Sequence, residues 1–298
     1  MYRKSLVMAL GLSAILLAGL TANLGAAVIT YTGATGGDWH EISNWDLGRL
    51  PEAADTVKIT SGRTVNISTD AVMSAFASGG GGPVNINSGG TLTGTSAYTM
   101  RYSNVTVNDG GTFNMPNQNI RSTVTINEGG TASGASGVGV ANDARTFAVN
   151  GTWSPLGTAT AGSFQVGGSV TGTVDLGATG TIFLDIFGSN SSEYFNVVGP
   201  TSGTRLRLNV PGSSLELRPQ GGYVPQLGDS FDLWNLAGGS LATMDIGDGS
   251  NISIVGSSYT LDASQWTTTG VVTVVVPEPA TMSLLGLGLV GLMARKRK

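Results

Sequence analysis

The side chains that could carry out acid–base or nucleophilic chemistry are few in this sequence. His40 is the single histidine of the 298 residues, and cysteine is absent, which excludes thiol chemistry and ordinary zinc sites. A Ser-His-Asp triad would have to use His40, but this residue lies near tryptophans and has no nucleophile-elbow motif beside it. The glycine run 79–82 is not followed by lysine and is therefore not a phosphate loop.

Two pairs of carboxylates could in principle act in hydrolysis or bind a cation. Asp109 and Glu128 occupy the same position in successive sequence repeats, and glycoside hydrolysis needs two carboxyl groups close together. Both precede Gly-Gly in a turn, however, where acidic residues are ordinary. Asp245 and Asp248 alternate with glycines and could hold a weak calcium ion, although turn chemistry explains them equally well. The sequence therefore predicts no catalytic residue, no metal site and no cofactor, and the protein is not expected to be an enzyme.

The elements that carry these residues are repeats. Three segments, 84–92, 105–113 and 124–132, are near copies that read apolar, polar, apolar, Asn, any residue, Gly-Gly, Thr. Shorter copies follow at 147–153 and 164–170. Four asparagines mark the repeats with spacings of 21, 19 and 23 residues: Asn87, Asn108, Asn127 and Asn150. Periods of about 20 residues are typical of solenoid proteins.

Each repeat predicts one alternating strand, a tight turn and a second strand. One copy cannot bury its apolar face alone, but stacked copies bury it in a continuous column. We therefore expect an all-β, right-handed parallel β-helix, with terminal signal helices outside it. Stacking would align two sets of apolar side chains across the coils: Val84, Val105 and Val124, and then Leu92, Phe113, Ala132 and Trp153. The recurring asparagines form either a structural ladder or a row of ligand contacts.

The repeats divide the exported part into three predicted regions: an N-terminal cap at 28–63, solenoid repeats at 64–172 and a C-terminal β region at 173–276. Trp39 and Trp45 in the cap are expected to plug the open end of the stack. The alternative for these two tryptophans is an exposed platform that contacts a glycan. From residue 173 the strands lengthen and the loops widen, which indicates a different cap or a small sandwich-like region.

The N-terminus has the three parts of a secretory signal peptide. Arg3 and Lys4 precede an apolar region at 6–20, and small residues follow at 25–27. Cleavage is expected after Ala26 or Ala27, so that 1–27 is the signal peptide. The alternative is an uncleaved N-terminal anchor.

The C-terminus also has three parts. Pro277, Glu278 and Pro279 end the preceding strand, because proline fixes φ and lacks an N–H group. The uncharged run 280–294 follows; it is short beside the roughly 17–25 residues of a full membrane span. Four cations, which the positive-inside rule keeps in the cytoplasm, close the chain: Arg295, Lys296, Arg297 and Lys298. The segment is predicted to be a short transmembrane stop-transfer element, and the alternative is a buried core helix.

This tail resembles the PEP-CTERM sorting signal of Gram-negative bacteria over its 22 residues. The resemblance implies recognition by a membrane-embedded exosortase, cleavage near Pro-Glu-Pro and delivery to the cell surface or the extracellular matrix, after a transient stage in the inner membrane. It implies no catalytic residue. Residues 31–59 resemble the opening of bacterial surface β-solenoids, and about 70 residues of the second half resemble the closing segment of autotransporter passenger-like solenoids.

Charge excludes one class of partner. Six of the 15 basic residues lie in the two terminal signals, so the part between them is net negative by about ten and nucleic acid binding is disfavoured. We expect a structural or adhesive exported protein, with exopolysaccharide as a partner on the strength of the family resemblance alone. The alternatives are a carbohydrate-active enzyme on the same fold and a glycan-binding module.

Overall fold

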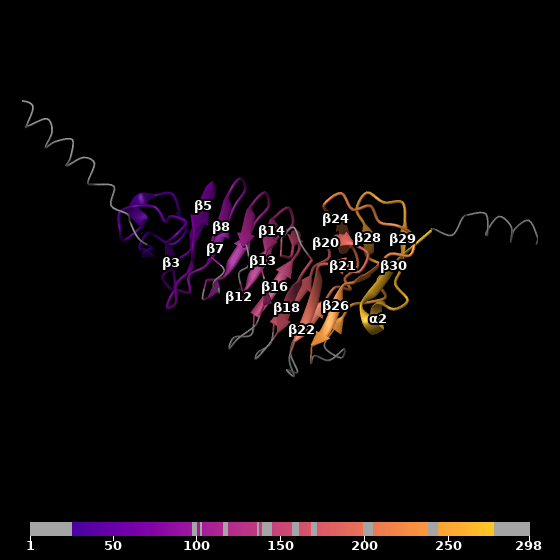
Figure 1. Cartoon of the computed structure of the whole chain (residues 1–298). Coiled ribbons are helices and arrows are strands. Elements are labelled where there is room, and N and C mark those ends of the chain that lie inside the picture. Colours follow the sequence, from indigo (N-terminus) through magenta and orange to yellow (C-terminus); the bar gives the residue numbers. More distant parts are fainter. Residues whose placement is uncertain are drawn as a thin grey trace, which may run out of the picture.

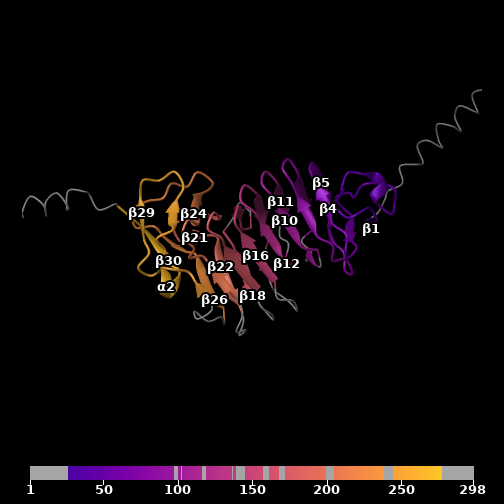
Figure 2. The ribbon, with the colours of Figure 1, turned by 180° about the vertical axis from the view of Figure 1, so that it is seen from behind.

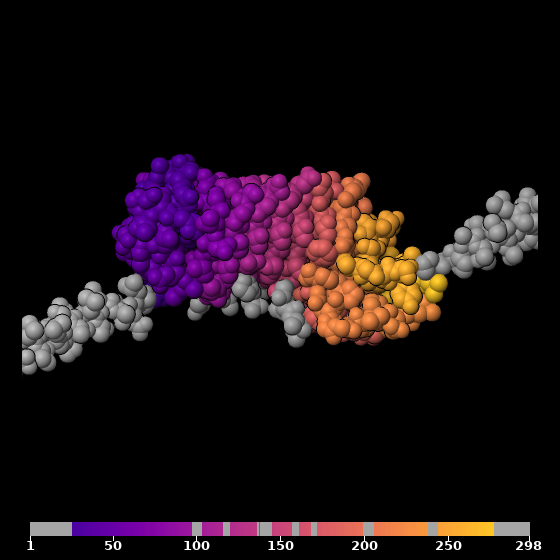
Figure 3. All heavy atoms as spheres, turned by 90° about the horizontal axis from the view of Figure 1, so that it is seen from above, coloured from indigo at the N-terminus to yellow at the C-terminus, as the bar shows by residue number. Residues whose placement is uncertain are grey.

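The computed structural model describes residues 26–96, 100–101, 103–115, 119–135, 137–138, 145–156, 161–167, 172–198, 205–237 and 244–276. Within these ranges the chain forms an elongated stack of short strands that runs from the N-terminal to the C-terminal end (Figure 1). Figure 3 shows the same order on the surface, as successive bands of colour. The sorting tail 277–298 and residues 1–25 of the predicted signal peptide lie outside the described residues, and so do the expected signal helices.

Three ladders of parallel strands build the stack, and between β7 and β26 the chain visits each ladder in turn in every coil. Ladder 1 contains β2 (Gly37–Asp38), β4 (Val65–Ile67), β7 (Val84–Ile86), β10 (Val105–Val107), β13 (Val124–Ile126), β16 (Arg145–Val149), β19 (Gly172–Leu176), β23 (Arg205–Arg207) and β27 (Met244–Asp245). Ladder 2 contains β5 (Asp70–Met73), β8 (Thr91–Gly94), β11 (Thr112–Met115), β14 (Thr131–Gly134), β17 (Thr152–Ser154), β20 (Thr181–Gly188), β24 (Ser214–Pro219) and β28 (Ile252–Ile254).

Ladder 3 contains β9 (Met100–Arg101), β12 (Asn119–Arg121), β15 (Gly137–Val138), β18 (Ser163–Gly167), β22 (Tyr194–Val198) and β26 (Trp234–Ala237). The short strand β21 (Ser191–Ser192) pairs antiparallel with β20. The predicted parallel β-helix is confirmed, since the expected columns pair in register: Val84 with Val105 and Val124, and Leu92 with Phe113, Ala132 and Trp153. The small Ala132 lies between two large rings, which lets this column fill its space without overpacking.

In the Gly-Gly turns, each of the two glycines is required for a different structural reason. Gly110 has φ 69°, in the left-handed region that favours glycine. A Cβ atom on Gly111 would lie 2.6 Å from the carbonyl oxygen of Ile86 in the coil below. Asn108 beside this turn donates its side-chain amide to Asn87 at 2.8 Å and accepts from Asn127 at 2.9 Å. The recurring asparagines therefore form the structural ladder at Asn87, Asn108 and Asn127.

Two small sheets close the ends of the stack. The N-terminal sheet is parallel and contains β1 (Val28–Tyr31), β3 (Thr56–Ile59) and β6 (Ala75–Phe76); the 3-10 helix η1 (Ile42–Asn44) lies between β1 and β3 in the chain. The C-terminal sheet is antiparallel and contains β25 (Ser230–Asp232), β30 (Val271–Val275) and β29 (Thr260–Asp262), with the single helical turn α2 (Trp266–Thr269). Seen from behind, these two sheets lie at opposite ends of the molecule (Figure 2).

The strand ladders cross the boundary that we expected at residue 173. β19, β20 and β22 pair in parallel with β16, β17 and β18, and the stacking continues to β27 and β28. The change of repeat spacing in the sequence therefore reflects longer loops and the inserted strands β21 and β25. The coiled arrangement of the chain itself continues.

Candidate functional site

The tryptophans proposed as a glycan platform are buried. Trp39 is 1% and Trp45 3% exposed, and their rings pack edge to face with 4.9 Å between centroids. The indole N–H of Trp45 donates to the carbonyl oxygen of Trp39 at 2.7 Å. The platform alternative is wrong because it needs exposed ring faces, and the capping role is the one that the burial supports. His40 lies beside this core, where its Nε2 is 2.8 Å from the carbonyl oxygen of Asp70 in the first full coil.

Three of the acidic residues singled out in the sequence lie in turns, namely Asp109, Glu128 and Asp248, and Asp245 ends strand β27. Asp109 and Glu128 are both exposed, directly after β10 and β13. Asp248 accepts the backbone N–H of Ser250 at 2.9 Å, and Asp245 accepts the side-chain amide of Asn209 at 3.3 Å. Among the described residues no group of three or more His, Cys, Asp and Glu side chains could hold a metal ion.

A cluster of charged side chains that we did not predict lies on ladder 2. Asp185 of β20 accepts the Nε of Arg218 at 2.6 Å and the amide of Gln220 at 3.0 Å. Arg218 also donates to the hydroxyl of Ser154 at 2.7 Å and lies over the ring of Phe183, 5.1 Å from its centroid. Three successive strands, β17, β20 and β24, are thus joined on the outside of the stack. The only sequence signal was a charged residue inside the apolar run 181–187.

Glu193 follows the β20–β21 hairpin and is fully buried. Its Oε2 accepts the backbone N–H of Asp185 at 3.0 Å, while its Oε1 has no hydrogen-bond partner among the described residues. Burial, helped by the nearby Asp185 carboxylate, raises the pKa of Glu193 to about 8, against the opposing effects of the hydrogen bond from the Asp185 N–H and of the Arg218 charge. Glu193 is therefore largely protonated at neutral pH.

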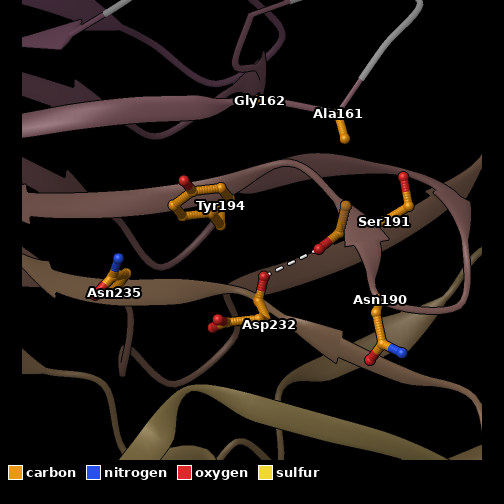
Figure 4. A pocket seen from close by; sticks show the side chains of 8 residues that line it. Ala161, Gly162, Asn190, Ser191, Tyr194, Asp232 and Asn235 are labelled. Atoms are coloured by element: carbon orange, nitrogen blue, oxygen red, sulfur yellow. Dashed lines mark hydrogen bonds between the residues drawn. The ribbon is translucent and has the colours of Figure 1, made fainter.

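A pocket of about 390 Å³ opens beside this hairpin. Its lining comes from β21, β22, β25 and β26 together with the loop before β18: Ala161, Gly162, Asn190, Ser191, Ser192, Tyr194, Asp232 and Asn235. Figure 4 shows Tyr194, Asp232 and Asn235 projecting from neighbouring segments, with Asn190 and Ser191 on the other side of Asp232. We call this the hairpin pocket. No local sequence pattern predicts this pocket, because its residues come together only through pairing between coils.

Backbone contacts fix the walls of the hairpin pocket. Asn190 adopts the left-handed conformation with φ 57°, and its N–H donates to the carbonyl oxygen of Ser230 at 2.9 Å. The hydroxyl of Ser192 donates to the carbonyl oxygen of Asp232 at 2.9 Å, which is the contact drawn in Figure 4. The backbone N–H of Tyr194 donates to the carbonyl oxygen of Gly162 at 3.0 Å. The pocket is therefore built on a rigid scaffold.

The chemistry of the hairpin pocket is hydrogen bonding beside an aromatic ring. Partial desolvation raises the pKa of Asp232 above its ordinary value. Asn235 pairs in register with Asn196, whose Oδ1 is buried without a partner among the described residues. Carboxylate and amide groups with a phenol ring suit a ligand that carries many hydroxyl groups. Asp232 is the one acid among the described residues that line this pocket, and the nearby pair Asp185 and Glu193 is buried at 3% and 0% exposure.

The predicted sorting residues Pro277, Glu278, Pro279 and Arg295 to Lys298 lie outside the described residues, but the point where they begin is clear. β30 ends at Val275 in the C-terminal sheet, and one residue separates it from Pro277. Among the described residues no helix is long and apolar enough to cross a membrane, and the predicted segment 280–294 lies beyond them.

Comparison with known proteins identifies the tail. No curated protein matches the chain. Residues 275–298 match the PEP-CTERM protein-sorting motif, which confirms the resemblance of the tail. Signals of this kind are processed by exosortase, a membrane enzyme, and imply export across the membrane to the cell surface. The chain therefore carries a PEP-CTERM sorting motif on a parallel β-helix, and it is an exported protein sorted through its C-terminus.

Proposed function

We propose that this exported protein has a structural or adhesive role at the cell surface or in the extracellular matrix, and that it binds exopolysaccharide through the hairpin pocket. Before processing, the tail holds the chain transiently in the inner membrane. The observation that carries the proposal is the hairpin pocket itself, where a tyrosine ring, a carboxylate and two amides surround about 390 Å³ of open space.

The stack suits a protein that presents such a pocket at a distance. The successive coils repeat the same parallel pairing, and a small sheet lies at each end, so the stack forms one long body. A rigid support also lowers the entropy that a binding site loses when it captures a flexible chain such as a polysaccharide.

The proposal is tested by binding of the full chain to an array of bacterial polysaccharides, with Tyr194→Ala and Asp232→Asn as variants. Loss of a hydrogen bond to a charged group typically costs about 1.5–3 kcal/mol, so we expect affinity to fall at least about tenfold for Asp232→Asn. Tyr259→Ala, which changes a half-exposed tyrosine outside the hairpin pocket, is the matched control and should bind normally. Equal binding by all variants would contradict the proposal.

A carbohydrate-active enzyme is the alternative, and the same experiment separates it. Hydrolysis needs a second carboxyl group near Asp232, whereas Asp232 is the one acid that the described part of the chain contributes to the pocket lining. Release of new reducing ends from a bound polysaccharide, lost in Asp232→Asn, would favour the enzyme over the binding module.

A further inference from the structure

The exposed large apolar side chains of the described residues gather at the two ends of the stack. Val28, Ile42 and Leu47 lie at the N-terminal end. The C-terminal end carries the larger group, which we call the exit surface: Val224, Leu227, Val255, Tyr259 and Val276. Contiguous exposed apolar side chains usually mark a contact with a partner or a membrane.

Strand pairing places the exit surface around the point where the chain leaves the domain. Val275 of β30 pairs with Thr260 of β29, so Val276 continues beside Tyr259. On the other side Gly228 donates its N–H to the carbonyl oxygen of Val274 at 2.9 Å, which brings the loop with Leu227 alongside. Figures 1 and 2 show β29 and β30 together at the C-terminal tip.

A shallow cavity of about 350 Å³ completes the exit surface. Its lining is uncharged: Pro219, Tyr223, Val224, Pro225, Val255, Gly256, Ser257, Ser258 and Tyr259. Lysine and arginine do not occur among the described residues of that lining, so the contact that these residues offer depends on apolar burial and on tyrosine, a residue that is enriched at membrane–water interfaces.

The length of the tail limits what can contact this surface. Only three residues separate Val276 from the apolar run that starts at Ala280. Four Cα–Cα steps join Val276 to Ala280 and reach at most about 14 Å, while a headgroup layer is about 5–8 Å thick. When the apolar run is in the bilayer core, Val276 therefore lies no more than about 9 Å beyond the outer edge of the headgroup layer.

We propose that the exit surface rests on the headgroup layer of the bilayer that holds the tail, so that the stack is docked on the membrane and not merely tethered to it. This inference depends on the membrane stage proposed above. The contact presents the Pro277–Pro279 segment at the membrane surface in a fixed orientation, where a membrane-embedded processing enzyme can reach it.

The absence of cysteine allows a direct test with single labels. Full-length chains carrying Leu227→Cys or Val224→Cys are labelled with an environment-sensitive fluorophore and reconstituted in vesicles of phosphatidylethanolamine and phosphatidylglycerol, with and without a lipid-borne quencher. Leu47→Cys is the matched control, because leucine 47 is 50% and leucine 227 is 61% exposed at opposite ends of the stack. Leu285→Cys reports on the tail.

We expect the labels at 224 and 227 to shift to the blue and to be quenched by lipid nearly as strongly as the label at 285, and the label at 47 to stay in water. A label at 285 in lipid with 224 and 227 in water would overturn the docking proposal alone. A label at 285 in water would overturn the membrane stage and the docking together. Blue shifts at 224 and 227 that depend on protein concentration and resist the lipid quencher would indicate a second copy instead, and would also overturn the docking.

Discussion

The N-terminal cap and the β20–β21 hairpin each bury a carboxylate, but the two carboxylates have opposite surroundings. Asp55 accepts the backbone N–H groups of Ala27 at 3.0 Å and Glu52 at 2.9 Å, and the Arg49 guanidinium at 2.5 and 2.9 Å. Glu193 accepts one N–H, and its second oxygen has no partner in the described part of the chain. Both are buried in the protein, so burial alone does not determine their ionisation.

The different surroundings shift the pKa values of Asp55 and Glu193 in opposite directions. The hydrogen bonds from Arg49 lower the pKa of Asp55 to about 2, against the opposing effect of burial. Burial raises the pKa of Glu193 to about 8 because its single hydrogen bond and the more distant Arg218 do not compensate. Asp55 thus fastens the cap as an ion, and Glu193 fills the hairpin as a neutral acid.

The largest effect is expected from removing the paired ion. Asp55→Ala leaves Arg49 and two backbone N–H groups without their acceptor, and breaking a buried pair costs about 3–5 kcal/mol of unfolding free energy. Denaturant unfolding of the full chain measures this. Glu52→Ala is the matched control, since its exposed carboxylate lies 3.9 Å from the same guanidinium and such pairs contribute at most about 1 kcal/mol. Equal effects of the two variants would show that the cap does not depend on Asp55.

The pH dependence of stability should have opposite signs for the two carboxylates. Folded Glu193 keeps its proton up to about pH 8, whereas the unfolded chain loses it near the ordinary value of 4.5, so stability falls as pH rises between these values. The loss is on the order of 5 kcal/mol and should vanish in Glu193→Gln. Asp55 does the reverse: its contribution, about 2 kcal/mol, is lost as pH falls from 3.8 toward 2.

Both pH-dependent changes are checked by measuring the free energy of unfolding with denaturant at a series of pH values between 2 and 9. Glu128→Gln changes a carboxylate on an exposed turn, and this variant should keep both pH-dependent changes in unfolding free energy. A wild-type curve that is flat between pH 4.5 and 8 would mean that Glu193 is not held neutral by the fold.

The smallest effect on stability is expected in the asparagine ladder, where the hydrogen bonds join neutral amide groups. Asn108→Ala removes both of its amide contacts in the ladder, and each such bond contributes about 0.5–1.5 kcal/mol. We expect a loss of about 1–2 kcal/mol by the same denaturant assay. Asn104→Ala is the control: this exposed asparagine accepts one N–H, from Thr123 at 3.3 Å, and should lose less.

The coil could be predicted where its sequence repeats at a fixed spacing. Stacked asparagines are 19 or 21 residues apart in the ladder, and those spacings placed the apolar columns correctly. Farther along, the stacked pair Thr181 and Ser214 is 33 residues apart, so the same coil carries no visible period. The boundary expected at residue 173 reflects this change of spacing.

The chemistry was harder to predict because it comes from long-range contacts. Arg218 reaches Ser154, 64 residues earlier, and the hairpin pocket joins segments from residue 161 to residue 235. The plugging of the N-terminal end by Trp39 and Trp45 could be expected from their types. Trp234 and Trp266 do the same at the C-terminal end, where the N–H of Trp234 donates to the carbonyl oxygen of Trp266 at 3.1 Å, and nothing local in the sequence links them.

The asparagine ladder has a consequence for how such a protein changes over generations. Within the ladder of Asn87, Asn108 and Asn127, the middle coil accepts an amide hydrogen from the next coil and donates one to the coil before, so a duplicated stretch of 19 to 21 residues inserted there would find both partners already in place. Every duplication would lengthen the molecule by about 4.8 Å, the spacing of neighbouring strands, and leave its ends unchanged. The reach of the protein from the cell is therefore a quantity that gene duplication can adjust one coil at a time.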